Sequence, residues 1–239
     1  MSPFQAWLQG VARLGLTWVA GAAMSACAGV PALGGANWRE EVLLHDGSKI
    51  VAERFVLRRG RHEIGQRPPI GEQSLSFTLP GSGQTITWED RFAEDLGAAN
   101  FNLKMLDIFN GTAYLLGSPA GCLSYNKWGR PNPPYVIFKY VGGKWERIPL
   151  EELPAEFKRP NLLSSSPDEV ARNKAHAGLV TAETVRQENE EYRQPEFRSI
   201  LREAYPGAAG GCEELVRYKG YWIMPNDPVG RSIVDRKSK

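Results

Sequence analysis

The sequence predicts a mainly β domain of the α+β class, built as an antiparallel meander of hairpins. Its 17 Pro, 25 Gly and 24 aromatic residues are typical of turn-rich β proteins. Tight-turn dipeptides separate short runs in which polar and apolar residues alternate, which is the period of a half-buried strand. Helical patterns are confined to residues 166–204, so we expect a helical insertion there and a C-terminal hairpin after it.

Four hairpins are expected before residue 150. Their turns fall at Asp46-Gly47, at residues 80–83, at Asn110-Gly111 and at Gly142-Gly143, where Gly and Asn tolerate the positive φ angles of tight turns. The expected strand pairs are 41–45 with 49–58, 74–79 with 85–88, 102–109 with 112–116, and 135–141 with 144–148. A further strand is expected at residues 122–126.

Helices are expected in the insertion. Ser166-Pro167-Asp168-Glu169 has the pattern of a helix start, with a capping hydroxyl, proline at the first position and acids in the first turn. That helix should end near Gly178, a second should run from Thr181 to about residue 194, and a short third should cover 197–204. The final hairpin is expected at 214–218 and 221–224, and residues 225–239 are expected to form a polar tail.

The N-terminus has the pattern of an export signal. Arg13 is its only charge, and the uncharged run over residues 14–26 is too short for a membrane-spanning helix, which needs about 20 apolar residues. We therefore expect residues 1–26 to be a signal peptide. A buried cytosolic helix that ends in a core cysteine is the alternative.

Met24-Ser25-Ala26-Cys27 resembles the lipobox of bacterial lipoproteins. The resemblance implies cleavage before Cys27, attachment of palmitate-like acyl chains to this residue, and a membrane anchor. Ala28 in place of aspartate implies sorting to the outer membrane, with the protein facing the periplasm. Alternatively, Ala26-Cys27-Ala28 fits cleavage after Ala28, which would give a soluble periplasmic protein.

The chain after the signal is expected to have three parts. Residues 27–36 would be the lipidated cysteine and a flexible tether, residues 37–224 a single β-rich domain with the insertion 166–204, and residues 225–239 the tail. Two cysteines then remain in the exported part, Cys122 and Cys212, and we predict a disulfide between them. Two unpaired buried thiols are the alternative.

Charge and motifs exclude several functions. Without the signal the chain carries 28 basic and 27 acidic residues, which argues against nucleic-acid binding. It has no nucleophile-elbow serine and no phosphate-binding loop, and His45, His62 and His176 lack metal-ligand spacing. His62 would need Asp90 or Asp95 beside it for acid–base chemistry, and a solvated loop histidine is the simpler interpretation. No catalytic residue, metal or cofactor is predicted.

Two surfaces are candidates for binding. The first is a basic loop suited to lipid head groups or anionic polymers, formed by Arg58, Arg59, Arg61 and Arg67. The second combines aromatic planes with amides on a Pro-stiffened loop, and we call it the aromatic loop: Tyr125, Asn126, Trp128, Asn132 and Tyr135. A solvated charged face and ordinary packing against the sheet are the respective alternatives.

The body is similar to an uncharacterised family of exported proteobacterial proteins, in the segments 126–135, 138–140 and 145–149. That resemblance implies export and no particular activity. We therefore expect a membrane-anchored envelope lipoprotein that acts as a non-catalytic binding module for an envelope protein or polymer. A periplasmic hydrolase and an immunity lipoprotein that neutralises a toxin are the alternatives.

Overall fold

A computed structural model of the chain describes residues 34–238, and these belong to one compact unit. The expected signal peptide, the lipobox with Cys27 and the first part of the tether lie outside the described residues.

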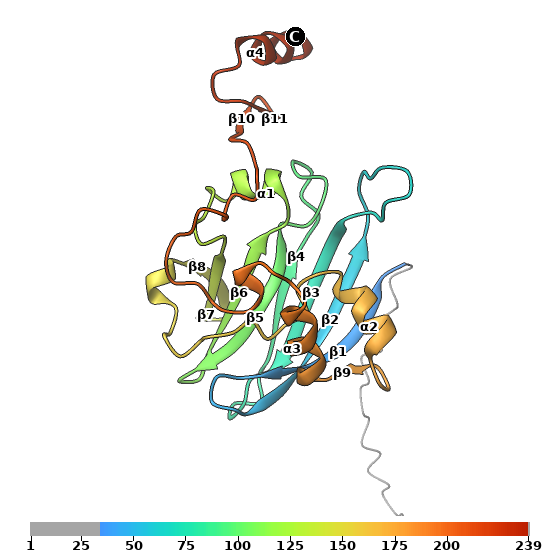
Figure 1. Ribbon diagram of the computed structural model, residues 1–239, viewed down its shortest axis with the longest axis vertical. Helices are drawn as coiled ribbons and strands as arrows, with labels where there is room; N and C mark the ends of the chain where they lie inside the picture. Colours follow the sequence, from blue (N-terminus) through green and yellow to red (C-terminus); the bar gives the residue numbers. More distant parts are fainter. Residues whose placement is uncertain (1–33, 239) are drawn as a thin grey trace, which may run out of the picture. The chain divides into compact units, whose positions relative to one another are not determined.

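Two antiparallel sheets and a small hairpin contain most of the strands (Figure 1). The five-stranded sheet has the order β4-β3-β2-β1-β9, and only its β1–β9 pair is parallel. Its strands are β1 (Ala36–Leu43), β2 (Lys49–Arg58), β3 (Ile70–Thr78), β4 (Thr85–Asp90) and β9 (Leu179–Val180). The four-stranded sheet is a meander of β5 (Phe101–Phe109), β6 (Thr112–Pro119), β7 (Val136–Val141) and β8 (Lys144–Ile148). The hairpin pairs β10 (Val216–Tyr218) with β11 (Tyr221–Ile223). The prediction of a mainly β hairpin meander is confirmed.

The turn dipeptides fix the register of these hairpins. Asn110 and Gly111 have φ angles of 49° and 74°, so they close the two-residue turn that brings Phe109 opposite Thr112. Positive φ at both central residues matches the right-handed twist of the flanking strands. Around Asp46-Gly47 the connection is longer, because the amide of Leu44 donates to Ser48 O at 2.9 Å.

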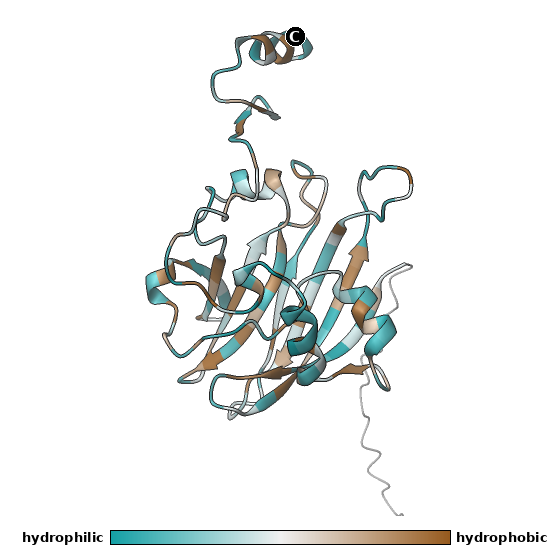
Figure 2. Ribbon diagram, viewed as in Figure 1, coloured by the Kyte–Doolittle hydropathy of each residue, from teal (hydrophilic) through white to brown (hydrophobic). Residues whose placement is uncertain are grey.

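The two sheets share one hydrophobic core. Alternate residues of β1 to β4 point to one face, and their buried side chains meet those of β5, β6 and β7 in a cluster that includes Phe77, Trp88 and Leu115. The other face of the four-stranded sheet is covered by a second cluster around Phe157 and Ile200. Consistent with this burial, hydrophobic residues recur along the strands of the four-stranded sheet in Figure 2.

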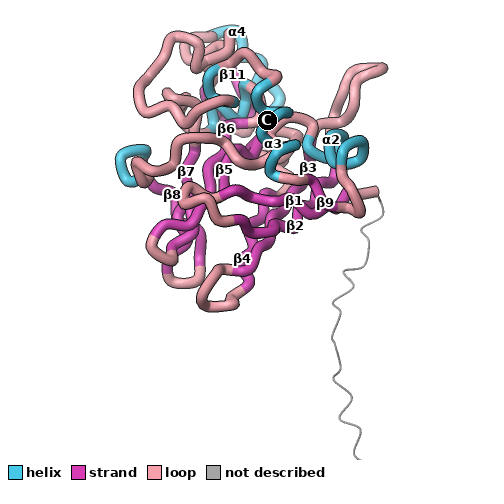
Figure 3. The backbone as a smooth tube through the Cα atoms, turned by 60° about the horizontal axis from the view of Figure 1, so that its bottom comes forward, coloured by secondary structure: helices cyan, strands magenta, loops and turns pink. Residues whose placement is uncertain are grey.

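Helices complete the structure, and their bounds are α1 (Cys122–Lys127), α2 (Pro167–Lys174), α3 (Ala182–Glu190) and α4 (Pro228–Lys237), with 3-10 turns at Leu150–Glu152 and Pro195–Phe197. Helices α2 and α3 lie beside β1 and β9 (Figure 3). They cover a third cluster on the sheet, which contains Trp38, Val56 and Val185.

Three local predictions were wrong. Residues 122–126 form α1 instead of a strand, because Gly121 at φ 85° turns the chain and its carbonyl accepts the amide of Tyr125. The expected third helix at 197–204 is limited to one 3-10 turn at Pro195–Phe197. The polar tail contains α4, whose start is capped by the Asp227 carboxylate accepting from the Gly230 amide at 2.8 Å.

Candidate functional site

The aromatic loop does not present an open surface. Tyr125 and Tyr135 are buried, at 7% and 5% exposure. Trp128 packs against the core with its ring 4.7 Å from that of Phe101, and its indole N–H donates to Asn100 Oδ1 at 3.1 Å. The packing interpretation therefore describes these aromatic side chains better than the binding surface does.

The two amides of the aromatic loop hold other parts of the chain in place. Asn126 donates to Glu213 O and accepts the Leu215 amide, both at 2.9 Å. Asn132 exchanges two hydrogen bonds with the backbone of Tyr205. Asn132 and Tyr135 do border a shallow groove of about 410 Å³, but their polar atoms are already engaged within the protein.

The basic loop is largely neutralised. Arg58 makes a bidentate pair with Asp168 of α2, at 2.8 and 2.6 Å, and Arg67 does the same with Glu169. Arg59 pairs with Glu72 at 2.6 Å and lies 4.1 Å from the ring centroid of Phe92. Arg61 has no acidic partner among residues 34–238. The loop is thus attached to α2 and β3 by ion pairs, and Arg61 is the one arginine of the four that lacks such a pair within residues 34–238.

His62 lies apart from the carboxylates considered for it. Its ring Nδ1 lies 3.1 Å from Gly60 O in an exposed loop, whereas Asp90 accepts from Asn100 and Asp95 pairs with Lys127. No cluster of metal-binding side chains occurs within residues 34–238.

A different histidine lies in a pocket beside a buried carboxylate. His45 Nδ1 is 2.7 Å from Asp107 Oδ1, and the backbone amide of His45 donates to Asp107 Oδ2 at 3.0 Å. The imidazole is held edge-on by Phe157, with ring centroids 5.3 Å apart. With Nδ1 directed to the carboxylate, Nε2 is the free ring nitrogen, because no hydrogen bond among residues 34–238 uses it and His45 lines the pocket. This atom is available to a ligand.

The Asp107 carboxylate is positioned by its surroundings and is only 3% exposed. Burial raises the pKa of Asp107, while the His45 ring and the backbone amides of Ile108 and His45 donate to the carboxylate and limit that rise. A buried acid beside Nδ1 fixes the orientation of a histidine ring, as it does in sites where the other nitrogen acts on a ligand.

The pocket has a volume of about 250 Å³. Its apolar wall comes from the end of β1 and from α3, and includes Leu43, Leu44 and Val185. Its charged rim includes Lys158 and Arg159, of which Lys158 has no carboxylate partner among residues 34–238. Glu156 lies on the same rim, and Arg159 is 3.9 Å from Glu190. The pocket therefore combines an apolar wall, a rim with charges of both signs on which Lys158 is unpaired, and one oriented imidazole.

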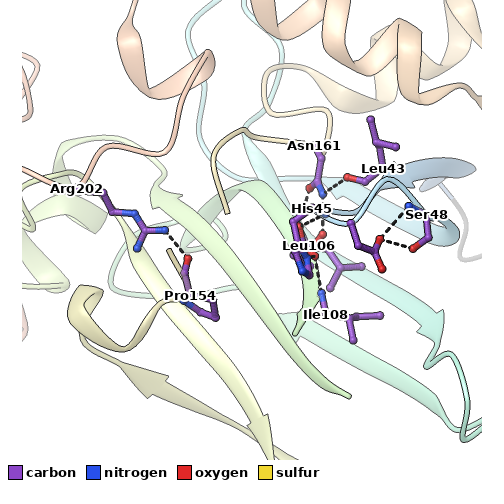
Figure 4. A network of polar contacts seen from close by, with 10 residues as sticks. Leu43, His45, Ser48, Leu106, Ile108, Pro154, Asn161 and Arg202 are labelled. Atoms are coloured by element: carbon purple, nitrogen blue, oxygen red, sulfur yellow. Dashed lines mark hydrogen bonds and ion pairs between the residues drawn. The ribbon is translucent and has the colours of Figure 1, made fainter. Parts of the chain in front are cut away.

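Asn161 connects the elements that form the pocket. Its amide donates to Leu43 O and Leu106 O, and its Oδ1 accepts the Leu106 amide at 2.9 Å (Figure 4). These bonds hold the end of β1 and its turn against β5, with His45 and Ile108 beside them. No motif spacing marks the His45–Asp107 pair, which is separated by 62 positions in the chain. The position of His45 next to the Asp46-Gly47 turn was the only available signal.

Cys122 and Cys212 form a disulfide, with their Cα atoms 5.2 Å apart, as the cysteine count predicted. The bond joins the first residue of α1 to the segment before β10. Arg130 reinforces this connection by donating to Cys212 O and Glu213 O, both at 3.0 Å.

The chain matches no protein-family model, no curated protein and no solved structure. Among residues 34–238, no helix is both long and apolar enough to cross a membrane.

Proposed function

We propose that this protein is an exported binding protein of the bacterial envelope that takes a small organic anion with an apolar body in the His45 pocket. The observation that carries the proposal is the His45–Asp107 pair, which leaves one imidazole nitrogen available at a pocket whose wall is apolar.

The chemistry of the lining supports this ligand class. Apolar side chains such as Leu43, Leu44 and Val185 favour a hydrocarbon or aromatic body. Lys158 at the rim, which has no carboxylate partner among residues 34–238, favours an anionic group, and the His45 ring supplies a directed hydrogen bond to fix orientation. A charge-assisted hydrogen bond of this kind contributes about 1.5–3 kcal/mol, which corresponds to at least a tenfold change in affinity.

Calorimetric titration with octanoate and with phenyl phosphate tests this proposal. We expect His45→Gln to weaken binding by at least about tenfold, because glutamine cannot reproduce the oriented ring nitrogen. Lys158→Gln should weaken binding less. His62→Gln is the matched control, since His62 is exposed and hydrogen-bonds only to its own loop.

Two results would contradict the proposed pocket. One is the absence of binding heat in calorimetry, and of chemical-shift changes in NMR spectra of the protein, with either probe at millimolar concentration. The other is equal weakening by His45→Gln and His62→Gln, which would place any binding outside the pocket.

Hydrolysis is the second candidate, and the same pair of side chains favours it. No Ser, Thr or Cys of residues 34–238 lines the pocket, so this candidate hydrolysis uses a nucleophilic water. His45 Nε2 would accept a proton from this water as its oxygen bonds to the carbonyl carbon of an ester, and the departing alkoxide would then receive that proton. Turnover of 4-nitrophenyl octanoate that is lost in both His45→Gln and Asp107→Asn would support this candidate.

We also propose that Cys27 is acylated and holds the protein at the outer membrane. The lipobox-like sequence supports this proposal, and the disulfide is compatible with an oxidising compartment. Fractionation of cells that express the Cys27→Ser variant tests it. The variant should leave the membrane fraction or keep its signal peptide, and unchanged attachment of a processed protein would refute the lipid anchor.

A further inference from the structure

Exposed large apolar side chains are concentrated in a short segment near the C-terminus. Eight of them are exposed within residues 34–238, and half of these lie between residues 221 and 233. The four are Tyr221, Met224, Val229 and Ile233, with exposures of 44%, 48%, 66% and 42%. Apolar side chains that gather in this way mark interaction surfaces more often than single exposed residues do.

The segment that carries these side chains is held in place by specific contacts. The Cys122–Cys212 disulfide fixes its start, and Asn126 fixes Glu213 and Leu215. The indole N–H of Trp222 donates to Asp95 O at 2.7 Å. The exposed side chains therefore belong to a segment that is anchored to the domain.

Helix α4 uses one side to pack on the β10–β11 hairpin. Val234 is 4% exposed, Asp235 accepts the Tyr218 hydroxyl at 2.9 Å, and the Arg231 guanidinium lies 5.4 Å from the Tyr218 ring centroid. Successive residues of an α-helix are 100° apart, so residues 231, 234 and 235 occupy one side. The opposite side carries Val229, Ile233 and Arg236, which we call the outward stripe.

The outward stripe combines apolar and cationic groups. Arg236 and its neighbour Lys237 have no carboxylate partner among residues 34–238, because Asp235 pairs with Lys219 on the hairpin side at 2.7 Å. This arrangement differs from that of the basic loop, where Arg58 and Arg67 are paired with acids. A helix face with apolar side chains and unpaired cations matches a surface that is apolar inside and negatively charged outside.

We propose that the outward stripe of α4 docks on an anionic lipid surface, with Val229 and Ile233 entering the boundary between head groups and acyl chains. A second copy of the chain fits less well. An isologous contact would bring the Arg236 side chains of both copies together, and one ten-residue helix offers far less than the roughly 800 Å² per partner of a stable interface.

Vesicle binding of the full chain tests this proposal. A Ser232→Cys variant carries an environment-sensitive dye beside the outward stripe, and a Ser82→Cys variant carries it in the exposed β3–β4 turn as the control. The parent chain treated with the same dye gives the background from Cys27. The vesicles contain phosphatidylcholine alone or an equimolar mixture with phosphatidylglycerol, so the proposed lipid anchor would contribute equally to both.

A blue shift of the Ser232→Cys reporter is expected on the anionic vesicles and not on the neutral ones. Two cations near the surface imply about 30-fold tighter partition at low ionic strength. Raising the salt concentration to about 0.5 M should remove most of that difference. The Ser82→Cys reporter should not respond to either vesicle.

Paired substitutions separate the two contributions. Arg236→Gln with Lys237→Gln should abolish the preference for anionic vesicles, and Val229→Ser with Ile233→Ser should weaken partition by about tenfold. Val51→Ser with Val141→Ser is the matched control, because these two valines are also exposed, at 45% and 42%. An intact Cys122–Cys212 bond in every variant, checked by alkylation, shows that the segment stays attached to α1, and an unchanged circular dichroism spectrum shows that it remains folded.

Three outcomes would overturn the proposal. The first is the same reporter response on neutral and anionic vesicles, and the second is no response on either. The third is a blue shift that grows with protein concentration without lipid, which would assign the stripe to a second copy of the chain.

Discussion

The aromatic loop and the His45 pocket differ in how completely their polar atoms are used by the fold. Trp128, Asn126 and Asn132 have the composition of a binding surface, yet each is engaged in packing or in hydrogen bonds to the protein itself. His45 has no such sequence context, yet its ring is oriented by Asp107 and keeps one nitrogen available. Residue composition alone therefore does not identify a binding group. A better indicator is a polar atom that has no hydrogen-bond partner within the folded protein.

The same difference separates two sets of cations. Arg58 and Arg67 form a prominent basic cluster in the sequence, but they are paired with Asp168 and Glu169 of α2. Arg236 and Lys237, in a segment that was expected to be a polar tail, have no acidic partner within residues 34–238. Local charge density in a sequence does not show which of these charges are compensated.

Removal of the disulfide should have the largest effect. The bond closes a loop with a sequence separation of 90, so Cys122→Ser with Cys212→Ser should lower the free energy of unfolding by about 4 kcal/mol on the chain-entropy model. Urea unfolding of the variant and parent chains measures this change. Because His45 is held by Asp107 and Asn161 is bonded to β1 and β5, the pocket should keep its affinity for octanoate. Parallel loss of affinity would show that the two regions are not independent.

Trp128→Ala should have the next largest effect on stability. It removes an indole that packs on Phe101 and leaves Asn100 without a donor, and the expected loss is about 3 kcal/mol. Thermal unfolding gives this value, and calorimetry should find octanoate binding unchanged. A stable Trp128→Ala variant would indicate that the ring is free for a ligand.

Lys104→Met should stabilise the protein, because it removes a buried cation. Lys104 is 2% exposed at a bulge in β5, and its ammonium lies 3.2 Å from the Phe197 ring centroid. Burial lowers the pKa of Lys104 to about 7. At pH 7 the unfolded chain binds this proton more strongly, so the substitution should raise the free energy of unfolding. We expect a gain of about 2 kcal/mol, less than the full pKa change implies, because the substitution also removes the cation–π contact with Phe197.

This stabilisation should depend on pH in one direction. The folded pKa lies below the unfolded value of 10.5, so the parent protein gains stability as the pH rises between these values. The advantage of Lys104→Met should therefore be smaller at pH 9 than at pH 7 in parallel urea titrations. An advantage that is constant over this range would mean that packing, and not charge, causes the effect.

Arg58→Gln should have the smallest effect, a loss of about 1 kcal/mol at neutral pH. Burial raises the pKa of Asp168, but the hydrogen bonds and charge of Arg58 outweigh burial and leave the pKa below its ordinary value. The stability from this pair is present above the ordinary carboxyl pKa and is lost as the pH falls, so the two proteins should converge in acid. Arg61→Gln is the control and should change the unfolding midpoint very little.

The strands were predictable because local rules decide them. Asn110-Gly111 and Gly142-Gly143 adopt the positive φ angles that their turns require, and the alternation of β1 to β4 matches one buried face. Residues 122–126 were assigned wrongly because five residues are too few for their hydrophobic pattern to distinguish a strand from about one and a half turns of helix. Only the bend at Gly121 decides between these two structures.

The candidate site was not predictable for a physical reason. His45 and Asp107 meet because β1 packs against β5 through the shared core and through Asn161, and this packing depends on contacts far apart in the chain. Whether Arg58 and Arg67 are paired with acidic residues likewise depends on where α2 packs. By contrast, the disulfide could be predicted from the count of cysteines alone.

The proposed roles are binding for the His45 pocket and structural support for the aromatic loop. A single comparison of octanoate affinity by calorimetry tests this most directly, with His45→Gln and the conservative Trp128→Phe as the two variants. We expect His45→Gln to weaken binding by at least about tenfold with little change in the unfolding temperature, and Trp128→Phe to leave affinity unchanged. Weaker binding by Trp128→Phe with full affinity in His45→Gln would assign binding to the aromatic loop and rule out the His45 pocket.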